Sequence, residues 1–407
     1  MRLPLISGEQ SSKHNIDQER IMAGSSFGFL TAADIRFGRG MALAGVKDLA
    51  NLGAPLLLVH GSNSKRADWL RLALLDQDIQ VQCFAVAGEP DIEMITKGVE
   101  QARAGAIAAV VSLGGGSVVD AGKALAALIP ATRPMLDHLE VVGQGLPLDV
   151  APLPFAALPT TAGTGAEVTK NAVLSVPEAR RKVSLRDSRM LPDIAIVDAS
   201  LTDNLPRSVT LASGLDAVTQ VIEPYLSCKA NWLTDALCRD AIPKGLEALA
   251  TLMQTEDPAA RDALAWTSLA GGLALANAGL GAVHGLAGVL GGVTGGAHGA
   301  LCGTLLPHVL ASNHARLHTL AEEAPLLARF DEVQHWIAAA IDCDHEQAFE
   351  SLKAWSANLG LPALAQLGLD KEQIPSIASA SLVSSSMKGN PVPLSQSDLE
   401  GILFAAL

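Results

Sequence analysis

Two histidines, His284 and His298, stand fourteen residues apart in a glycine-rich segment that carries no charged side chain. The uncharged run extends from residue 263 to residue 315, and a run of this length usually forms a buried core or a membrane span. Neither setting accommodates two imidazoles unless polar groups meet them there. Asp216 and Gln220 are one helical turn apart and would share a helix face. We expect these four residues to form a metal pocket in which one ligand is altered.

A second candidate site is a glycine loop between an expected strand and an expected helix. Gly114, Gly115 and Gly116 directly follow a short apolar run. Glycines let the backbone approach an anion closely, and the start of a helix offers unpaired N–H groups and a positive dipole end. The loop matches neither Gly-x-Gly-x-x-Gly nor a P-loop, so an ordinary tight turn is the alternative. The strand before the loop and the helix after it favour a pyrophosphate site.

The elements that must position the glycine loop alternate between apolar runs and amphipathic stretches. We expect strands at 55–60, 81–86, 109–113, 155–159, 182–185 and 193–197, and helices at 67–77, 91–104 and 118–128. Strands separated by helices imply a parallel sheet with right-handed crossovers. The first half of the chain is therefore predicted to be a doubly wound α/β domain.

The second half has a different pattern and is predicted to be all-α. Helices are expected at 208–217, 234–253, 259–279 and 302–313. Turn-forming residues near 204–207 suggest the boundary. We expect a mobile tail at 1–25, an α/β dinucleotide-binding domain at 26–205, and a helical domain at 206–407 that carries the metal and substrate site.

Bulk properties exclude several classes of protein. The formal net charge of −13 over 407 residues, without a stripe of Lys and Arg, argues against nucleic-acid binding. The apolar stretch at 266–283 is interrupted by glycines and lacks basic flanks, which predicts a buried helix and no membrane contact. Five scattered cysteines predict reduced thiols, and the apolar run at the start is too short for a signal peptide. We expect a cytoplasmic protein.

The chain resembles the iron-containing (group III) alcohol dehydrogenase family over residues 37–313. The resemblance lies in motifs that follow in order: Gly-Gly-Gly-Ser-x-x-Asp-x-x-Lys at 114–123, Pro-Thr-Thr-Ala-Gly-Thr-Gly-Ala-Glu-Val-Thr at 159–169, Gly-Leu-Asp-Ala at 214–217, Val-His-Gly-Leu-Ala at 283–287, Ala-His-Gly-Ala at 297–300 and Leu-Leu-Pro-His at 305–308. It implies a dinucleotide-binding α/β domain, a helical domain, and an active site in the cleft between them. A homodimer is also expected.

The resemblance also implies which residues bind a dinucleotide. The glycine loop would hold the pyrophosphate with Ser117, and Asp120 would lie near the cofactor. Thr160, Thr161 and Thr164 would line the adenine and nicotinamide side. Lys182 occupies the position of a family lysine that reaches the cofactor's ribose or phosphate. Hydroxyl groups that donate and accept, and an ammonium group that neutralises phosphate, suit these roles.

The end of the first nucleotide-binding strand bears on the choice between NAD and NADP. Family members that prefer NAD often carry an Asp there, where it accepts hydrogen bonds from the ribose. This chain has Gly61 instead, followed by Ser62, Lys65 and Arg66. Without a carboxylate to repel the 2′-phosphate, we expect NADP to be preferred slightly over NAD. The alternative is that the two basic residues only begin an exposed helix.

The metal pocket departs from the family pattern at two positions. The family's metal set is one Asp and three His, and its first pair is Asp-x-x-x-His, where this chain has Asp216 and Gln220. An additional family His, four residues after the first of the later pair, is Gly288 here. Asp216, His284 and His298 could still bind Fe(II) or Zn(II), with Gln220 as a weak fourth ligand. The alternative is a hydrogen-bonded cluster without an ion.

The expected function is therefore an NAD(P)-dependent dehydrogenase or carbonyl reductase that acts on a small alcohol, aldehyde or keto compound. Asp216, His284 and His298 would be its catalytic residues, either through a metal ion or by donating a proton to the carbonyl oxygen. A metal-independent keto-acid reductase resembling maleylacetate reductases is the second possibility. A nucleotide-binding relative without catalysis is the third, and dehydroquinate synthases match the motifs less well.

Overall fold

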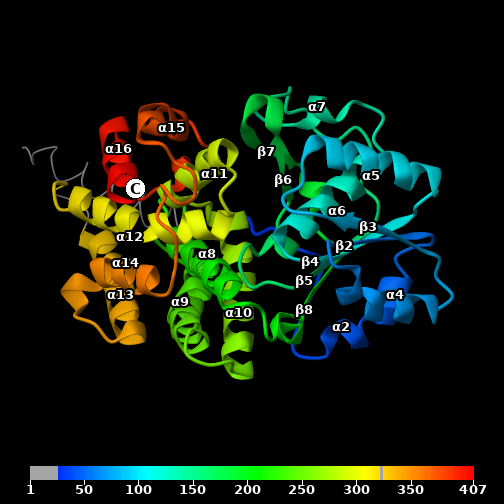
Figure 1. Cartoon of the computed structure of the whole chain (residues 1–407), viewed down its shortest axis with the longest axis horizontal. Coiled ribbons are helices and arrows are strands. Elements are labelled where there is room, and N and C mark those ends of the chain that lie inside the picture. Colours follow the sequence, from blue (N-terminus) through cyan, green and yellow to red (C-terminus); the bar gives the residue numbers. More distant parts are fainter. Residues whose placement is uncertain (1–25, 321–323) are drawn as a thin grey trace, which may run out of the picture.

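The computed structural model describes residues 26–320 and 324–407, so the tail expected at 1–25 lies outside the described residues. Figure 1 shows an α/β part beside a helical part, with the C-terminus in the helical part. This arrangement confirms the predicted fold class.

Six parallel strands form the main sheet of the described residues, in the order β1-β8-β5-β4-β2-β3. The strands are β1 (Asp34–Phe37), β2 (Leu56–Gly61), β3 (Val81–Val86), β4 (Ala109–Gly114), β5 (Phe155–Pro159) and β8 (Ile194–Val197). Because β2 pairs with both β3 and β4, the direction of strand addition reverses between β2 and β4. Ligands of open α/β sheets bind at the carboxyl ends of strands at such a switch point.

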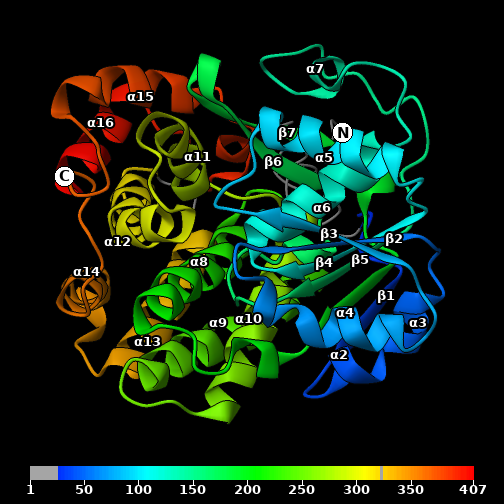
Figure 2. The same ribbon diagram turned by 45° about the vertical axis from the view of Figure 1, so that its right-hand side comes forward.

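Helices cover both faces of this sheet (Figure 2). They are α2 (Met41–Ala44), α3 (Val46–Ala50), α4 (Asp68–Leu75), α5 (Ile92–Ala104), α6 (Gly116–Leu128) and the short outlying α7 (Met135–His138). Successive side chains of a strand point to opposite faces. Leu57 and Val59 of β2 accordingly pack with α5 and α6, whereas Leu56 and Leu58 pack with α3 and α4.

The strand expected at 182–185 is present, but it is not part of the main sheet. It is β7 (Arg181–Arg186), which pairs antiparallel with β6 (Asn171–Val176) in a separate two-stranded ribbon. Its burial alternates, with Val183 and Leu185 buried and the end residues Arg181 and Arg186 exposed, as in a ribbon with one covered face.

The rest of the described chain is helical. The helices are α8 (Arg207–Leu226), α9 (Trp232–Leu252), α10 (Pro258–Ala278), α11 (Ala282–Thr294), α12 (His298–Leu317), α13 (Ala324–Ile341), α14 (Ala348–Asn358), α15 (Ile374–Leu382) and α16 (Gln396–Ala405). The helix expected at 208–217 continues to Leu226, and α12 begins four residues before its expected start. The glycine-rich segment contains α11, which we did not predict.

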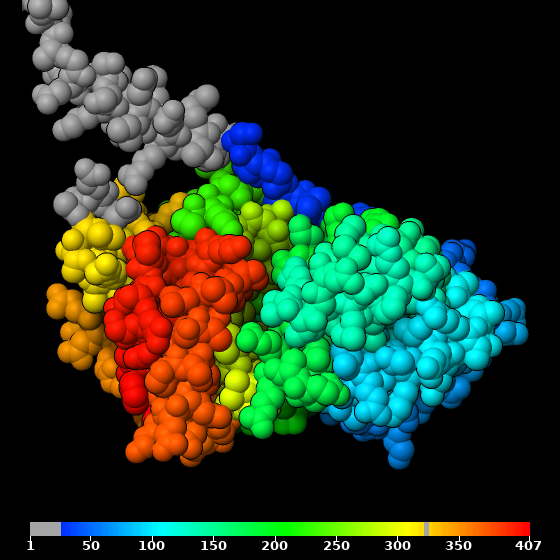
Figure 3. All heavy atoms as spheres, turned by 90° about the horizontal axis from the view of Figure 1, so that it is seen from above, coloured from blue at the N-terminus to red at the C-terminus, as the bar shows by residue number. Residues whose placement is uncertain are grey.

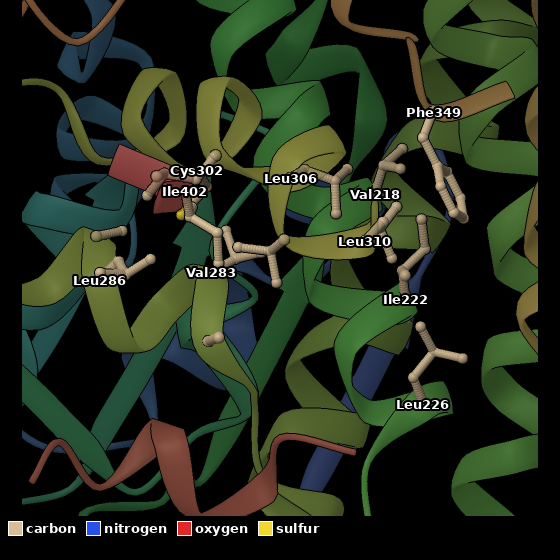
Figure 4. Close-up of a cluster of buried hydrophobic side chains, with 14 of the residues drawn as sticks. Val218, Ile222, Leu226, Val283, Leu286, Cys302, Leu306, Leu310, Phe349 and Ile402 are labelled. Atoms are coloured by element: carbon tan, nitrogen blue, oxygen red, sulfur yellow. The ribbon is translucent and has the colours of Figure 1, made fainter. Parts of the chain in front are cut away.

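The helical core is built around α8 and α12 (Figure 4). Cys302, Leu306 and Leu310 follow one another at four-residue intervals along α12 and belong to this core. Glycine allows α12 to approach α8 closely, because a methyl group on Gly303 would lie 2.8 Å from Leu215 Cβ. The close approach sets the distance between the functional side chains of the two helices.

Membrane-spanning potential is weak in the described residues. No single helix there is both long enough and apolar enough to cross a bilayer. α10 and α11 meet the criterion only as a pair, and they are bent by 99° at the break between them. Most residues of α10 and more than half of those in α11 are buried within the fold.

Candidate functional site

The glycine loop joins β4 to α6 at the carboxyl edge of the sheet. Gly114 ends β4, Gly115 caps α6 and Gly116 is the first residue of the helix. A methyl group on Gly116 would lie 2.7 Å from Thr164 Cγ2, and one on Gly115 would lie 3.2 Å from Thr161 Oγ1. The glycines are thus in contact with two of the predicted threonines.

The threonine loop, residues 160–169, follows β5 and is fixed to the glycine loop and to α6. Its Thr160 N–H donates to the Gly114 carbonyl at 2.9 Å. The buried Lys123 ammonium donates to the Ala166 carbonyl and to Thr169 Oγ1, both at 2.9 Å, and to a third acceptor on β6. Lys123 therefore sets the position of the loop relative to α6.

Asp120 takes part in the same anchoring network. Its carboxylate lies 3.3 Å from Lys123 Nζ and accepts a hydrogen bond from Val173 N at 3.0 Å. Burial raises the pKa of Asp120 and lowers that of Lys123, and each charge opposes the shift of the other. These contacts tie α6 to β6, and Ser117 lies half-buried in the first turn of α6.

The other predicted cofactor residues lie at two places. Gly61 ends β2, which is the neighbour of β4 across the switch point, and Ser62 follows it in an exposed turn. Lys182 lies on β7, where its ammonium forms an ion pair with Glu89. A methyl group on Gly291 of α11 would come within 2.7 Å of Lys182 Nζ. Lys182 therefore connects the ribbon to the helical part.

The acidic and imidazole residues of the expected metal pocket meet where α8, α11 and α12 converge. Asp216 Oδ1 lies 3.6 Å from His284 Nε2 and 3.7 Å from His298 Nε2. Asp216 is 2% exposed and His284 is 7% exposed, whereas the side chain of His298 retains 34% exposure. His298 is thus the imidazole of this cluster that reaches the open side of the site.

Cys302 is a member of this cluster that sequence reasoning missed. Its sulfur lies 3.6 Å from His298 Nε2, and the residue is fully buried. The ligand atoms of Asp216, His284, His298 and Cys302 all lie within 4.8 Å of one another. The sequence offered one signal, because Cys302 follows His298 by four residues and residues at this spacing share a helix face. This signal predicts a contact only if the helix already begins at His298.

Glu223 is the second missed residue. His284 Nδ1 donates to Glu223 Oε2 at 2.6 Å, and the other carboxylate oxygen accepts from Val283 N at 2.7 Å. This contact leaves His284 Nε2 directed at Asp216. A carboxylate that fixes the tautomer and orientation of an imidazole is the usual outer partner of a metal-binding histidine. Glu223 follows Asp216 by seven residues, so both lie on one face of α8.

Gln220 lies on the same face of α8, between Asp216 and Glu223. Its side-chain nitrogen donates to the Thr164 carbonyl at 2.7 Å. The amide therefore links α8 to the threonine loop. We expected Gln220 to be a weak metal ligand through its side-chain oxygen. The hydrogen bond to Thr164 involves the side-chain nitrogen and does not use that oxygen.

The charges in the cluster favour a carboxylate surrounded by cationic imidazoles. Cys302 and Asp216 raise the pKa of His298 to about 9 against the effect of burial. Burial lowers the pKa of His284, but Cys302 and Glu223 outweigh it and the pKa lies well above its usual value. Burial raises the pKa of Asp216, yet the two imidazoles bring it below its usual value. The pocket therefore stabilises separated charges.

The donor set fits a divalent metal ion. Asp216 Oδ1 and His284 Nε2 are buried and have no hydrogen-bond partner in the described part of the chain. Unsatisfied buried polar atoms are costly, and two that converge on one point suit a shared ligand. Oxygen and nitrogen donors at about 2.0–2.2 Å from a tetrahedral ion stand about 3.3–3.6 Å apart. The observed separations of 3.6 and 3.7 Å are close to this spacing.

Open space adjoins the cluster at Gly288 on α11. A methyl group on Gly288 would meet no atom within 4 Å. Figure 3 shows a hollow between the red and orange C-terminal helices and the green and cyan atoms of the α/β part, with the yellow part of the chain at its base. The absence of a side chain at Gly288 leaves room for a substrate there.

Comparisons with known proteins match the chain over most of its length. Models of two families match: iron-containing alcohol dehydrogenase at residues 32–199, and the C-terminal part of the Fe-containing alcohol dehydrogenase family at residues 210–407. The lactaldehyde reductase of Escherichia coli (strain K12) is 31% identical over 322 residues, 79% of this chain and 82% of that protein. The NAD-dependent methanol dehydrogenase of Bacillus methanolicus is 31% identical over 302 residues, 74% of this chain and 77% of that protein. A crystal structure of 1,3-propanediol oxidoreductase aligns with a TM-score of 0.82 at 28% identity, covering 94% of this chain and 100% of that one.

Proposed function

The chain belongs to the iron-containing alcohol dehydrogenase family, and we propose that it transfers hydride between a nicotinamide dinucleotide and a small alcohol or carbonyl compound. Family membership makes it an oxidoreductase of alcohols and aldehydes. The observation that carries the finer proposal is the hydrogen bond from Gln220 to the Thr164 carbonyl. It joins the helix that carries Asp216 to the loop that would line the dinucleotide. A cofactor on that loop would therefore end beside the Asp216 cluster.

The chain's own residues would bind and orient the two reactants. The glycine loop and the start of α6 would hold the pyrophosphate through N–H groups and the helix dipole. Thr161 and Thr164, which contact the glycine loop, would line the cofactor. When bound, the dinucleotide would donate hydride to a carbonyl compound or accept it from an alcohol. Gly288 would leave space for the carbon chain of the substrate beside the cluster.

Asp216, His284 and His298 would hold a divalent ion in this site. Glu223 would keep His284 in the tautomer that presents Nε2 to the ion. When bound, such an ion acts as a Lewis acid toward the substrate oxygen. His298, whose side chain retains 34% exposure, would lie between the buried cluster and the substrate.

We also propose a preference for NADP(H). β2 ends in Gly61, and the segment after it presents Ser62, Lys65 and Arg66, all exposed. No carboxylate in this segment would repel a 2′-phosphate, and the two cations would attract one. The measurement is kcat/KM for NADPH and NADH in the wild type and in Lys65→Ala/Arg66→Ala. A strong NADH preference in the wild type would refute the proposal, and an unchanged cofactor ratio in the variant would remove these residues from it.

The test of hydride transfer combines cofactor binding with turnover. Gly116→Ala would place a methyl group against Thr164, and we expect the Kd for NAD(P)H to rise at least about tenfold, or about 1.4 kcal/mol. Gly401→Ala is the matched control, because its methyl group would meet no atom within 4 Å. Turnover is followed by nicotinamide absorbance over a panel of aldehydes and ketones, with and without added Zn(II) or Fe(II). Cofactor binding without any turnover would support the non-catalytic nucleotide-binding alternative instead.

A metal-independent keto-acid reductase is the second candidate function. Gln220 favours it, because a carboxamide is a poorer transition-metal ligand than the imidazole that the family resemblance implies. The discriminating measurement is turnover of 2-oxo acids by protein that has been dialysed against a chelator. Full activity in metal-free protein would favour this candidate over the metal-dependent one.

A further inference from the structure

We propose that Cys302 is the fourth ligand of the metal site, so that the site is Asp216–His284–His298–Cys302 and prefers Zn(II) to Fe(II). The proposal rests on the metal-binding part of the proposed function. It adds a ligand that neither the family resemblance nor the motif spacing supplies.

The position of Cys302 follows from the helix that carries it. His298 is the first residue of α12 and Cys302 lies one turn later, so both side chains lie on the same face. The sulfur lies 3.6 Å from His298 Nε2 and within 4.8 Å of the ligand atoms of Asp216 and His284. The close packing at Gly303 brings this turn of α12 against the turn of α8 that carries Asp216.

The spacing of the four atoms suits one ion. For zinc, sulfur ligands stand at about 2.3 Å and nitrogen ligands at about 2.0–2.1 Å, so the two lie about 3.4–3.8 Å apart around a tetrahedral centre. The sulfur–nitrogen separation of 3.6 Å falls within that interval. Asp216 Oδ1 and His284 Nε2, which are buried and have no hydrogen-bond partner among the described residues, complete the set.

Cys302 replaces a ligand that α8 does not provide. The family resemblance implies an imidazole one turn after Asp216, where this chain has Gln220 with its amide nitrogen on the Thr164 carbonyl. The chain instead has a soft donor one turn after His298 on α12. The fourth ligand would therefore have moved from α8 to α12, while the number of protein ligands stays at four.

The exchange changes which metal the site selects. A thiolate and a carboxylate together balance the charge of a divalent ion, which favours binding in a buried pocket. Thiolate ligands select zinc, whereas a set of imidazoles and a carboxylate suits iron as well. Binding would release the protons held by the thiol and the imidazoles. Zinc sites can expand to five-coordinate during catalysis, so four protein ligands are compatible with turnover.

The test uses Co(II) as a visible substitute for Zn(II), which is spectroscopically silent. Full-length protein is freed of metal with a chelator and titrated with Co(II), and absorption is recorded. We expect one equivalent of Co(II) and a near-ultraviolet sulfur-to-cobalt charge-transfer band. Cys302→Ala should abolish the band and weaken binding at least about 100-fold. Cys238→Ala is the matched control, because Cys238 is equally buried in the same helical core but is not a member of the Asp216 cluster, and the band should persist.

A double variant tests whether misfolding, rather than loss of a ligand, explains the weaker Co(II) binding of Cys302→Ala. Cys302→Ala/Gln220→His restores an imidazole at the position the family resemblance implies. We expect it to regain Co(II) affinity without regaining the charge-transfer band. Competition between Zn(II) and Fe(II) should favour Zn(II) in the wild type and do so less in the double variant.

Each outcome bears on the proposal separately from turnover. One equivalent of Co(II) without the band, or a band that persists in Cys302→Ala, would overturn it, as would the absence of any tight metal binding. A band in protein that never oxidises NAD(P)H would leave the ligand assignment standing and refute the proposed function. Turnover by metal-free protein would refute the metal-dependent part of the proposed function, and the Co(II) band would still decide the ligand assignment.

Discussion

Glu167 provides a sharp test of how the threonine loop is buried. The carboxyl group lies in that loop, is 2% exposed, and burial raises its pKa from 4.5 to about 7. A native-state pKa above the unfolded value means that the folded protein binds the proton more tightly. Stability from this group is fully present below pH 4.5 and is lost as the pH rises through 7. At 1.36 kcal/mol per pKa unit, the loss amounts to about 3 kcal/mol.

Glu167→Gln removes the ionisation and keeps the shape of the side chain. We expect the variant to gain about 3 kcal/mol in free energy of unfolding relative to wild type between pH 4.5 and pH 8. The assay is urea unfolding of both proteins at the two pH values, followed by tryptophan fluorescence and by circular dichroism. The stability difference between variant and wild type is taken at each pH, and the two values are then subtracted. This subtraction cancels the contribution of groups that titrate identically in both proteins.

Glu100→Gln is the matched control, because Glu100 is an exposed carboxyl group on α5. An advantage of Glu167→Gln that is the same at pH 4.5 and pH 8 would refute the reasoning, since it would mean that Glu167 ionises in the folded protein as readily as in the unfolded chain.

Three further predictions concern the residues around the two loops and the cluster. Lys123→Met breaks the buried pair with Asp120, and we expect the free energy of unfolding, measured by urea unfolding, to fall by about 3–5 kcal/mol. NAD(P)H binding should also weaken. Unchanged stability would show that the pair is dispensable. Glu223→Gln should weaken Co(II) binding about 10–100-fold because His284 loses its carboxylate partner, yet keep the sulfur-to-cobalt band. The side chain added by Gly288→His would occupy open space, so the thermal unfolding temperature should change little. kcat/KM should fall more for bulky carbonyl substrates than for small ones. An equal effect on both would mean that substrates do not use this space.

The α/β part was predictable because its signals are local. Short apolar runs bounded by turns gave the bounds of β3 and β5 to the residue. The strand expected at 182–185 is present as β7, but it lies in an antiparallel ribbon outside the main sheet, and its alternating polar and apolar residues at 181–186 are typical of a ribbon with one covered face. The four-residue strand β1 was missed because it pairs only with β8, which lies about 160 residues later in the chain.

The glycine-rich segment was harder, because helix propensity there opposes the structure. α11 contains Gly285, Gly288, Gly291 and Gly292, each of which costs about 1 kcal/mol relative to alanine in a helix. Its start is stabilised from outside, since Asn390 accepts from Ala282 N and Glu223 accepts from Val283 N. A helix held by side chains that come from distant parts of the chain cannot be inferred from its own residues.

The same limit explains why the cluster was predicted only in part. Asp216, His284 and His298 have side chains that mark a site by type alone, and the structure brings all three together. Cys302 carries no such mark, because a lone cysteine in an apolar helix is more often a core residue, and its neighbours along α12 are core leucines. Its place in the cluster depends on α12 beginning at His298 and on the glycine contact that brings α12 against α8. The substitution at Gln220 and the cysteine on α12 are therefore best considered together, because a lost imidazole on one helix and a buried sulfur on the next address the same coordination position.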